Sequence, residues 1–450
     1  MPPSYCLAVN CGSSSIKFKV FEVLDDAEGD HHVLVAGSAS NVQGDKPAKY
    51  AYKWASQGSD DGSEPKLDYE DSRELDSETA YEDVFERILA DVTDERVLGH
   101  DGKDKIRIVA HRIVHGGTAD SPIVIKHGDK DEQKVLDDMD KVSDFAPLHN
   151  HHAMLIVKKC LESLPQANSV LCFDTLFHQT IPDYRTTYAI SQPLHKTPVP
   201  LRRFGFHGLS YGSIVKKMSR QLKVHVKELN LIVAHLGSGG STCLIQEGKS
   251  VNTSMGVTPL EGLPGGTRSG TLDPSLIFHH TKDCSETVEW SGRQITKAEF
   301  VLNKESGFKA LTGTSDFGEI TERAKGASGE DQKQSQLAYN LYLDRLMLYL
   351  SSYISSLFSS APPNNKLHAL VFSGGIGEHS VEIRRDVLQK LSWVEKLDGS
   401  GGGIDNSANE EATGTRSITK QGSKIVAWVV ETDEELESVQ LSAKAVQESA

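Results

Sequence analysis

One pattern of residues occurs twice in this 450-residue chain and constrains its fold more than any other feature. In residues 6–23, an apolar run ends at Asn10, small residues follow, and alternating apolar residues then resume. Residues 231–247 repeat this order, with His235 at the place of Asn10. Each copy predicts a strand, a tight turn rich in glycine and serine, and a second strand. Such turns leave backbone N–H groups open to an anion. We therefore expect a duplicated domain with a polyphosphate held between its halves.

Length and charge limit the classes of protein to be considered. A chain of 450 residues, 38% hydrophobic and 25% charged, is long enough for two domains with sizeable cores. It carries 63 acidic against 48 basic residues, a formal net charge of −15. This excess of negative charge argues against non-specific binding of nucleic acid. A site for anions must therefore gather its positive charge locally.

The cysteines and the apolar runs indicate where such a protein works. The six cysteines form no C-x-x-C pair and have no metal-ligand spacing, which predicts thiols in a reducing compartment. No signal peptide is evident at the N-terminus. The most apolar 18-residue stretch, 341–358, is interrupted by Asp344 and Arg345, so we expect no membrane span. A cytoplasmic protein without a membrane or nucleic-acid partner is predicted.

Residues 25–83 read as an elaboration of the first hairpin. Within 57–83 there are eleven acidic and two basic residues, which predicts an exposed, mobile loop. A calcium site is the alternative, but the carboxylates lack EF-hand spacing. Residues 81–92 then show the apolar spacing of a helix.

Two predicted strands end in charged residues. Arg112 follows an apolar strand at 106–110, close to paired glycines, where it could bind a substrate anion or form a surface salt bridge. Asp174 follows a strand at 169–173. Its carboxylate could orient a nucleophile, coordinate Mg²⁺ through water, or cap the next turn.

Histidines mark two further segments. Residues 149–152 read His-Asn-His-His and open a predicted helix at 153–164. Adjacent side chains point apart and no carboxylate or cysteine is spaced to complete a zinc site, so a helix cap or substrate loop is favoured. His207 lies beside glycine in 202–208 and could donate to an oxyanion or serve a structural role.

The second half of the chain adds a long loop and a glycine turn. Residues 255–274 are too rich in Gly and Pro for a regular element, which predicts a functional loop carrying Arg268. Residues 334–360 predict a long helix whose apolar stripe is core or a dimer contact. At 369–378 a strand leads into a glycine turn, and a helix follows at 381–391. This arrangement lets a nucleotide approach the backbone at the N-terminus of a helix.

Taken together, these motifs resemble one family, the acetate kinases, within the larger group of sugar kinases, heat-shock-70 ATPases and actin. The resemblance covers nearly the whole chain and rests on VNCGSSSIKF, HRIVHGG, FDTLFHQTIP, RRFGFHG, TPLEGLPGGTRSGTLDP, FSGGIGE and TDEEL. It implies an α/β fold of two duplicated actin-like (ribonuclease H-like) domains with a nucleotide cleft between them. The implied domains are 1–175, completed by 434–450, and a nucleotide-binding and dimerisation domain at 176–433.

The resemblance also implies a reaction and a set of residues. The reaction would be reversible, direct in-line transfer of the ATP γ-phosphoryl to acetate, giving acetyl phosphate and ADP, with Mg²⁺ or Mn²⁺, in a homodimer. Asn10 and Glu434 match the metal-associated positions. The residues matching catalytic positions are Asp174, Arg112, His207, Arg268 and His149. In the family the two arginines hold acetate and the transferring phosphoryl, and the histidine that His207 matches stabilises that phosphoryl.

Two binding regions follow from the same resemblance. The acyl pocket would comprise Arg112, Val114, Leu148, Phe206 and Pro259. The nucleotide would contact Ser14, Lys17, His235, Gly237, Ser238, Gly239, Asp316, Gly375, Ile376, Gly377 and Glu378.

Departures from the family pattern leave alternatives open. Bacterial relatives usually have Asn where this chain has Ser238, and an arginine is missing from residues 314–319. Both places lie near the nucleotide in the family, so pyrophosphate is an alternative phosphoryl donor. Propionate is the nearest alternative acceptor, because one methylene discriminates by only about 1–3 kcal/mol. A sugar kinase would need a polar, hydroxyl-binding pocket, and a heat-shock-70-like binding protein would need a peptide-binding domain that we do not expect.

Overall fold

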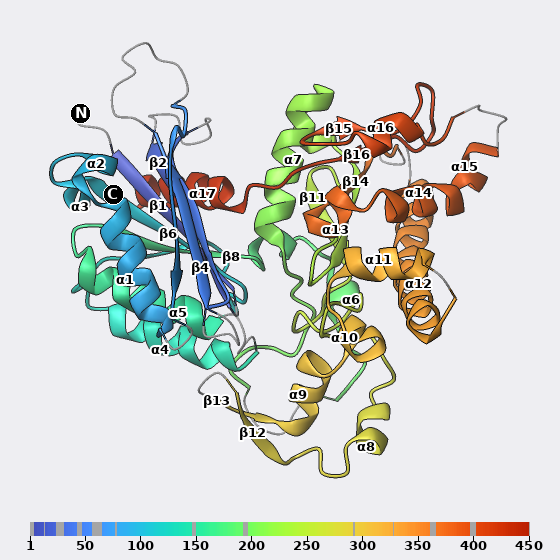
Figure 1. Ribbon diagram of the computed structural model, residues 1–450, viewed down its shortest axis with the longest axis horizontal. Coiled ribbons are helices and arrows are strands. Elements are labelled where there is room, and N and C mark those ends of the chain that lie inside the picture. The colour runs from blue at the N-terminus through green and yellow to red at the C-terminus, as the bar shows by residue number, and fades with distance from the viewer. Residues whose placement is uncertain are drawn as a thin grey trace. The chain divides into compact units, whose positions relative to one another are not determined.

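The computed structural model describes residues 4–12, 14–23, 31–42, 47–55, 65–76, 79–145, 150–191, 197–290, 293–326, 328–360, 366–396 and 402–449. The chain divides into two compact units (Figure 1). The first unit comprises Met1–Leu176, Leu194–Pro200 and Asp433–Ala450, and the second comprises Phe177–Pro193 and Leu201–Thr432. Each unit is built around its own sheet.

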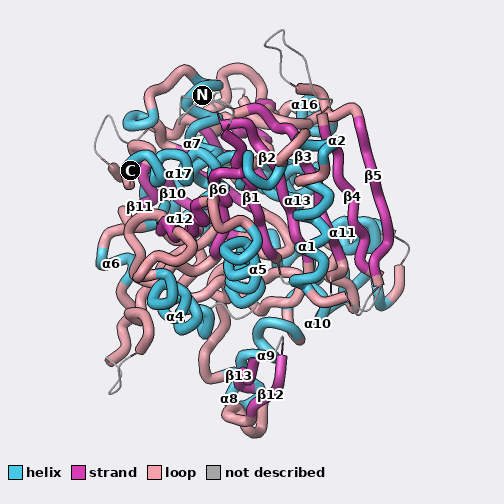
Figure 2. The backbone as a smooth tube through the Cα atoms, turned by 90° about the vertical axis from the view of Figure 1, so that its left-hand side faces the viewer, coloured by secondary structure: helices cyan, strands magenta, loops and turns pink. Residues whose placement is uncertain are grey.

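In the described residues, the first unit contains an eight-stranded sheet with the order β5-β4-β3-β2-β1-β6-β8-β7. Its strands are β1 (Ser4–Cys11), β2 (Ser15–Val23), β3 (His32–Ser40), β4 (Ala48–Trp54), β5 (Tyr69–Leu75), β6 (Ile106–Ile113), β7 (Ile123–Ile125) and β8 (Asn168–Phe173). Strand β1 runs antiparallel to β2 and parallel to β6, which is parallel to β8. Figure 2 shows β2 to β5 side by side.

The second unit contains a six-stranded sheet, counted over the described residues, with the order β11-β10-β9-β14-β16-β15. Its strands are β9 (Leu231–His235), β10 (Ser241–Gln246), β11 (Lys249–Thr253), β14 (Ala369–Ser373), β15 (Arg416–Ser417) and β16 (Ala427–Val429). Strand β9 runs antiparallel to β10 and parallel to β14, which is parallel to β16. A separate hairpin pairs β12 (Thr287–Trp290) with β13 (Arg293–Thr296).

The two sheets share one topology at their centres. In the first, the order is β3-β2-β1-β6-β8, and in the second it is β11-β10-β9-β14-β16, with the same strand directions. Asn10 lies opposite Arg112 on the neighbouring parallel strand, and His235 lies opposite Ser373 in the same way. The predicted duplication is therefore confirmed. The strand register also confirms that Asn10 and His235 occupy matching positions.

The helices of the first unit are α1 (Tyr81–Val92), α2 (Glu95–Leu98), α3 (Gly102–Lys105), α4 (Glu132–Val142), α5 (Asn150–Ser163) and α17 (Glu434–Glu448). Helices α5 and α17 pack on the sheet, and α1 and α4 pack on α5. The spacing of Val84, Ile88 and Val92 puts them on one buried face of α1, at the predicted place. Helix α17 returns from the end of the chain to pack on β1, β6 and β8. The Asp433 side chain caps it by accepting from the Leu436 N–H at 3.0 Å.

The second unit has an apolar core built on α12 (Glu330–Phe358), the predicted long helix. Fully buried α12 side chains such as Leu346 and Leu350 pack in one cluster with Ile232, Leu244 and Leu370 of the sheet. The other helices are α6 (Asp183–Thr186), α7 (Gly208–Leu222), α8 (Leu276–His280), α9 (Lys297–Lys304), α10 (Gly307–Thr312), α11 (Phe317–Lys325), α13 (Gly374–His379), α14 (Val381–Lys390), α15 (Ser392–Lys396) and α16 (Asn406–Glu410).

Three local predictions are corrected by the structure. The acidic stretch was predicted to be a loop, but β5 lies within it and pairs along its length with β4. Strand β6 continues to Ile113, because Ile113 pairs with Phe173, so Arg112 lies inside the strand. The predicted glycine turn at 373–378 is itself helical, since α13 begins at Gly374. Residues 57–64 and 77–78 of the acidic stretch lie outside the described residues.

None of the helices in the described part of the chain combines the length and the hydropathy that crossing a membrane requires.

Candidate functional site

The carboxyl ends of the strands in the first unit carry a cluster of charged side chains. Arg112 near the end of β6 binds Asp174 through two parallel hydrogen bonds, from Nε at 3.1 Å and from Nη2 at 2.8 Å. Asp174 follows β8 directly and is fully buried, and its backbone N–H donates to the Ile113 carbonyl at 3.0 Å. A buried carboxylate is stable only when it is paired, so this bidentate pair fixes the plane of the guanidinium.

The other edge of the same guanidinium faces Asn10 and Glu434. Nη1 of Arg112 lies 3.1 Å from Asn10 Oδ1 and 3.1 Å from Glu434 Oε2, and Asn10 Nδ2 donates to Glu434 at 2.9 Å. Burial alone would lower the pKa of Arg112, but the charges on Asp174 and Glu434 raise it above its usual value. The guanidinium therefore stays charged within a set of side chains drawn from β1, β6, β8 and α17.

Acidic groups outnumber basic groups in this cluster. Lys19 pairs with Asp433 at 2.8 Å and with Glu435 at 3.6 Å, and Asn10 Nδ2 lies 3.4 Å from Glu435. Burial, together with the negative charges on Glu434 and Asp433, raises the pKa of Glu435 against the opposing effect of Lys19. The excess negative charge is a feature that a bound divalent cation would relieve.

The chemistry of these side chains fits Mg²⁺ in its usual mode. Mg²⁺ takes oxygen ligands and is generally held by one or two carboxylates together with waters and substrate phosphates. Glu434 and Asn10 offer such oxygens beside one another. Within the described residues no three His, Cys, Asp or Glu side chains converge as a complete metal cage. Glu434 and Asn10 could thus supply one or two of the ligands of such an ion.

In the second unit, His207 directly precedes α7 and has an uncommon backbone conformation. Its φ of 60° and ψ of 25° lie in the left-handed region, where a residue with a Cβ is strained. Its Nδ1 lies 2.9 Å from Ser241 Oγ, at the start of β10, and its ring centroid lies 4.6 Å from that of His235. The imidazole is thus half-buried and held at the edge of the second sheet.

Arg268 lies against the glycine turn between β9 and β10. A Cβ on Gly239 would come within 2.9 Å of Arg268 Nη1, so glycine leaves the room that the guanidinium occupies. The loop carrying Arg268 is joined to the turn by a hydrogen bond from the Gly266 N–H to the Ser238 carbonyl at 2.8 Å. Arg268 Nη1 also lies 3.4 Å from the Pro259 carbonyl. The long Gly- and Pro-rich loop is therefore ordered and places a cation beside the turn.

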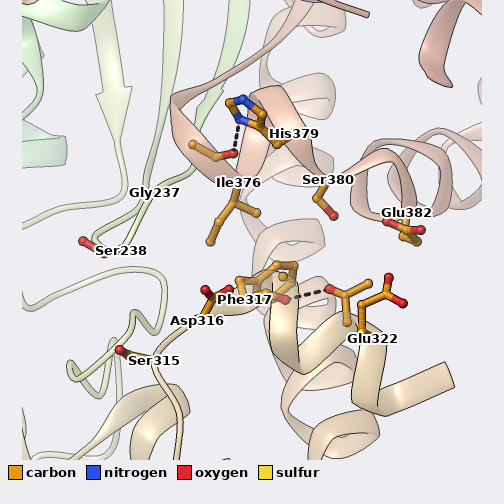
Figure 3. A pocket seen from close by; sticks show the side chains of 13 residues that line it. Gly237, Ser238, Ser315, Asp316, Phe317, Glu322, Ile376, His379, Ser380 and Glu382 are labelled. Atoms are coloured by element: carbon orange, nitrogen blue, oxygen red, sulfur yellow. Dashed lines mark hydrogen bonds between the residues drawn. The ribbon is translucent and has the colours of Figure 1, made fainter. Parts of the chain in front are cut away.

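A cavity of about 460 Å³ opens next to the same turn (Figure 3). The residues that line it are Gly237, Ser238, Ser315, Asp316, Phe317, Gly318, Thr321, Glu322, Gly375, Ile376, His379, Ser380 and Glu382. Ile376 of α13 and Phe317 of α11 give the cavity apolar walls on opposite sides. A Cβ on Gly375 would meet no atom within 4 Å, so this glycine faces open space.

Several of the residues predicted to contact a nucleotide line this cavity, and others do not. Gly237, Ser238, Asp316, Gly375 and Ile376 do line it. Asp316 also caps α11 by accepting from the Glu319 N–H at 3.1 Å.

Gly377 is buried, and Glu378 accepts from the Gly374 N–H at 2.8 Å, with its pKa raised by burial. Neither is among the lining residues. Ser14 and Lys17 are exposed and belong to the first unit.

The predicted acyl-pocket residues divide between the two units. Val114 lies just after β6 in the first unit and is 7% exposed. Phe206 is buried and Pro259 half-buried in the second unit. Leu148 and His149 lie outside the described residues.

Sequence reasoning missed some residues of these clusters. Ser241 and Tyr211 contact His207 or its partner, and Glu435 joins the acidic group. Two signals could have indicated them: the four-residue spacing of His207 and Tyr211 on one helix face, and the adjacency of Glu434 and Glu435.

Comparison with known proteins assigns the chain to a family. The model of the acetokinase family matches residues 5–440, nearly the whole chain. The chain belongs to the acetokinase family. Over 436 residues it is 45% identical to a probable acetate kinase of Cryptococcus neoformans, covering 96% of each chain.

Two solved structures match this chain over nearly their whole length and share its fold. A propionate kinase from Francisella tularensis matches with a TM-score of 0.77 at 32% identity, over 98% of this chain and 99% of that one. The acetate kinase of Porphyromonas gingivalis matches with a TM-score of 0.75 at 28% identity, over 98% and 100%. The expected α/β fold of duplicated actin-like units is therefore confirmed, and so is the resemblance read from the motifs.

Proposed function

We propose that this chain catalyses the reversible transfer of the ATP γ-phosphoryl group to acetate, giving acetyl phosphate and ADP. Phosphoryl transfer to a carboxyl group is the activity for which its curated relatives are named. The observation that carries the proposal is the bidentate Arg112–Asp174 pair at the strand ends of the first unit. It presents a fixed guanidinium, the group best suited to a small carboxylate or a phosphoryl.

The nucleophile needs no base in this reaction. Acetate is ionised at pH 7, because carboxyl groups have pKa values near 4. One acetate oxygen attacks the γ-phosphorus, the bond to the β,γ-bridging oxygen breaks, and ADP leaves with the electron pair. No proton is transferred in this step. Asp174 is therefore an orienting partner of Arg112 rather than a proton acceptor.

Charge stabilisation and positioning then supply the catalysis. The transition state of phosphoryl transfer is loose in most analyses, with negative charge spread over three equatorial oxygens. Arg112 and Arg268 are proposed to hold acetate and the phosphoryl group, and His207 to stabilise the phosphoryl as it moves. His149 is proposed as a further histidine of the site.

Mg²⁺ or Mn²⁺ is proposed as the metal, held by Glu434 and Asn10 together with phosphate oxygens and water. When bound, such an ion neutralises phosphate charge and orients the polyphosphate. The pairing of Asn10 with Glu434 and the surplus of carboxylates beside Arg112 support the assignment.

The cavity beside Gly237 is proposed to hold the nucleoside of ATP. Its volume lies in the range of small-molecule sites, and its apolar walls suit the flat face of a base. Pyrophosphate has no group to fill this space, so the cavity favours ATP over pyrophosphate despite the departures at Ser238 and Gly318. Gly377, Glu378, Ser14, Lys17 and the ring of His235 are kept as proposed nucleotide contacts.

Propionate is the second acceptor to be considered, because a solved relative is a propionate kinase. The proposed acyl pocket combines Val114, Phe206, Pro259 and Leu148. A pocket of this kind separates acetate from propionate by only about 1–3 kcal/mol. We therefore propose acetate as the preferred and propionate as the weaker acceptor.

Trapping with hydroxylamine tests the proposal. Acyl phosphates react with hydroxylamine to give hydroxamates, which can be measured with acetate, propionate and butyrate against ATP and pyrophosphate. We expect hydroxamate with ATP and acetate, less with propionate, and none without Mg²⁺. ATP consumption without any hydroxamate would overturn the proposed function, and hydroxamate with pyrophosphate alone would overturn the proposed donor.

A homodimer in the cytoplasm is proposed as the working form. Leu337 and Leu348 are exposed, and their spacing puts them on one face of α12, where an apolar contact with a second copy would cover them. The thiols of all six cysteines are unoxidised, five of them buried, as suits a reducing compartment. Light scattering after size exclusion measures the oligomeric state, and a mass of one chain would contradict the dimer.

A further inference from the structure

Hydrogen bonds link three side chains of the second unit, those of Tyr211, Ser241 and His207. The hydroxyl oxygen of Tyr211 lies 2.5 Å from Ser241 Oγ, and Ser241 Oγ lies 2.9 Å from His207 Nδ1. Tyr211 and Ser241 are fully buried, whereas the imidazole reaches partial exposure. These hydrogen bonds therefore connect the interior of the second unit to the imidazole of His207, which the proposed function uses.

The local structure holds all three members in place. Tyr211 follows His207 by one helical turn, and its backbone N–H donates to the His207 carbonyl at 3.0 Å. Ser241 is the first residue of β10 and pairs across the sheet with His235. His207 itself keeps a left-handed backbone conformation, which is strained for a residue with a Cβ. Such strain persists only where the surroundings determine the conformation, as these contacts do here.

The directions of these two hydrogen bonds determine which ring nitrogen of His207 carries a proton. A hydroxyl has one proton to donate and two lone pairs that accept. If Tyr211 donates to Ser241, the Ser241 proton is available for Nδ1 of a neutral imidazole, whose own proton then lies on Nε2. If the imidazole is charged, Nδ1–H donates to Ser241 and Nε2 again carries a proton. With Tyr211 as the donor to Ser241, Nε2 is therefore a donor in both charge states, whereas the opposite direction would put the proton of a neutral imidazole on Nδ1.

We propose that Ser241, itself fixed by Tyr211, is a positioning residue that holds His207 with Nε2–H directed at the transferring phosphoryl group. This inference rests on the proposed function, because it gives His207 its orientation in that reaction. A donor held in advance stabilises charge in the transition state without reorganisation. Ser241 and Tyr211 act through His207 and do not touch the substrate in this account.

The test compares Ser241→Ala, Ser241→Thr and Tyr211→Phe with the parent chain in the hydroxylamine assay. We expect Ser241→Ala to lower kcat at least tenfold at pH 8.5, with the KM values for ATP and acetate within about threefold of the parent. The loss should be smaller at pH 6, because a charged imidazole carries a proton on Nε2 without help from Ser241. Ser241→Thr keeps the hydroxyl and should restore kcat, and Tyr211→Phe should show a smaller loss of the same kind.

A matched control removes the same type of bond from another histidine. His178 Nδ1 lies 2.8 Å from Ser250 Oγ, and both side chains are buried in the second unit. Ser250→Ala should lower the melting temperature about as much as Ser241→Ala does, but its kcat should show no new dependence on pH. This control separates a general loss of stability from a loss of orientation at His207.

Different results would contradict the positioning role of Ser241 and the proposed function on which it rests. If the parent forms no hydroxamate, the proposed function fails. If the parent is active and Ser241→Ala has a kcat within threefold of it at both pH values, only the positioning role fails. A loss that Ser241→Thr does not restore also overturns that role, and a loss of equal size at pH 6 and pH 8.5 overturns the assignment of the proton to Nε2.

Discussion

The two sheets repeat one topology but carry different chemistry at their strand ends. In the first, Asn10 and Arg112 are neighbours on β1 and β6, and both belong to a charged cluster. In the second, the matching neighbours are His235 and Ser373, and neither is an arginine or a carboxylate. Below the strand ends, the matching central strands β1 and β6 of the first sheet and β9 and β14 of the second are mostly buried and apolar. Duplication thus preserved the scaffold, while the strand-end residues diverged.

This difference matches the two halves of the proposed reaction. A carboxylate acceptor and a metal ion need fixed charges, which the first unit supplies through Arg112, Asp174 and Glu434. A nucleoside needs space and apolar walls, which the second unit supplies beside Gly237 and Gly375. The phosphoryl group in transit needs donors, for which the second unit has His207 and Arg268. The predictions below test this division, from the largest expected effect to the smallest.

The two arginines should differ in what their loss does to the fold. Arg268→Ala and Arg112→Ala should each lower kcat by about 10³ or more, as the loss of a transition-state arginine does. Arg112→Ala should also cost about 3–5 kcal/mol of unfolding free energy, because it leaves the buried Asp174 carboxylate without its guanidinium. Kinetics and urea denaturation measure the two effects.

Near-normal turnover in either arginine variant would refute its assigned role. If Arg112→Ala and Arg268→Ala had the same unfolding free energy, the buried Arg112–Asp174 pair would add no special stability to the first unit. Arg112→Ala combined with Asp174→Asn is the control, since it removes the buried charge along with its partner and should regain part of the stability.

Buried histidines in both units should make the fold sensitive to acid. Burial lowers the pKa of His111 to about 3 and that of His178 to about 4. The unfolded chain binds these protons near pH 6.5, so the unfolding free energy falls as pH drops below 6.5. His178→Gln should flatten this fall by up to about 3 kcal/mol by pH 4.

The exposed His100 provides the control for this measurement. His100→Gln should leave the pH dependence of the unfolding free energy as it is in the parent chain. A His178→Gln variant with the parent's full acid sensitivity would show that this histidine is protonated in the folded state.

Loss of one carboxylate should weaken metal binding in the first unit. Glu434→Gln should raise the Mg²⁺ concentration for half-maximal activity about 10–100-fold, the range expected when a group around a metal is lost. The neighbouring Glu435→Gln, whose parent carboxyl has a raised pKa, should shift it much less. A Mg²⁺ titration of acetyl phosphate formation compares them, and equal shifts would argue against Glu434 as the ligand.

The acceptor pocket should respond to a single side chain. Val114→Ala enlarges the proposed pocket and should raise the ratio of kcat/KM for propionate over acetate about tenfold. Ile113→Val removes one methylene from the neighbouring core position, against two carbons in Val114→Ala, and should leave the ratio unchanged. An unchanged ratio in Val114→Ala would remove this residue from the pocket.

The parts of the fold that could be predicted are those with a short-range signal. The repeated turn indicated the duplication, and the apolar spacing of 81–92 indicated α1, because burial of one face dictates both patterns. The strand β5 could not be predicted from its acidic composition. It forms because β4 offers a strand partner along the whole length from Tyr69 to Leu75.

The candidate site divides in the same way. The motifs marked Arg112, Asp174 and Glu434, but only the packing of α17 on β1 and β6 explains why residues far apart in sequence share one guanidinium. The contact between Ser241 and Tyr211 was missed because Ser241 carries no pattern of its own and the four-residue spacing of His207 and Tyr211 is a weak signal. Tertiary contacts of this kind leave little trace in a single sequence.

Equilibrium binding of ADP tests the division between the units most directly. Calorimetry on the parent, Gly375→Val and Arg112→Gln would compare a variant that fills the cavity of the second unit with one that alters the charged cluster of the first. The added side chain at Gly375 has room, so the fold should persist. We expect Gly375→Val to weaken ADP binding at least tenfold and Arg112→Gln to bind ADP within about threefold of the parent while forming no acetyl phosphate. Undiminished ADP binding by Gly375→Val, with binding lost in Arg112→Gln, would contradict the account.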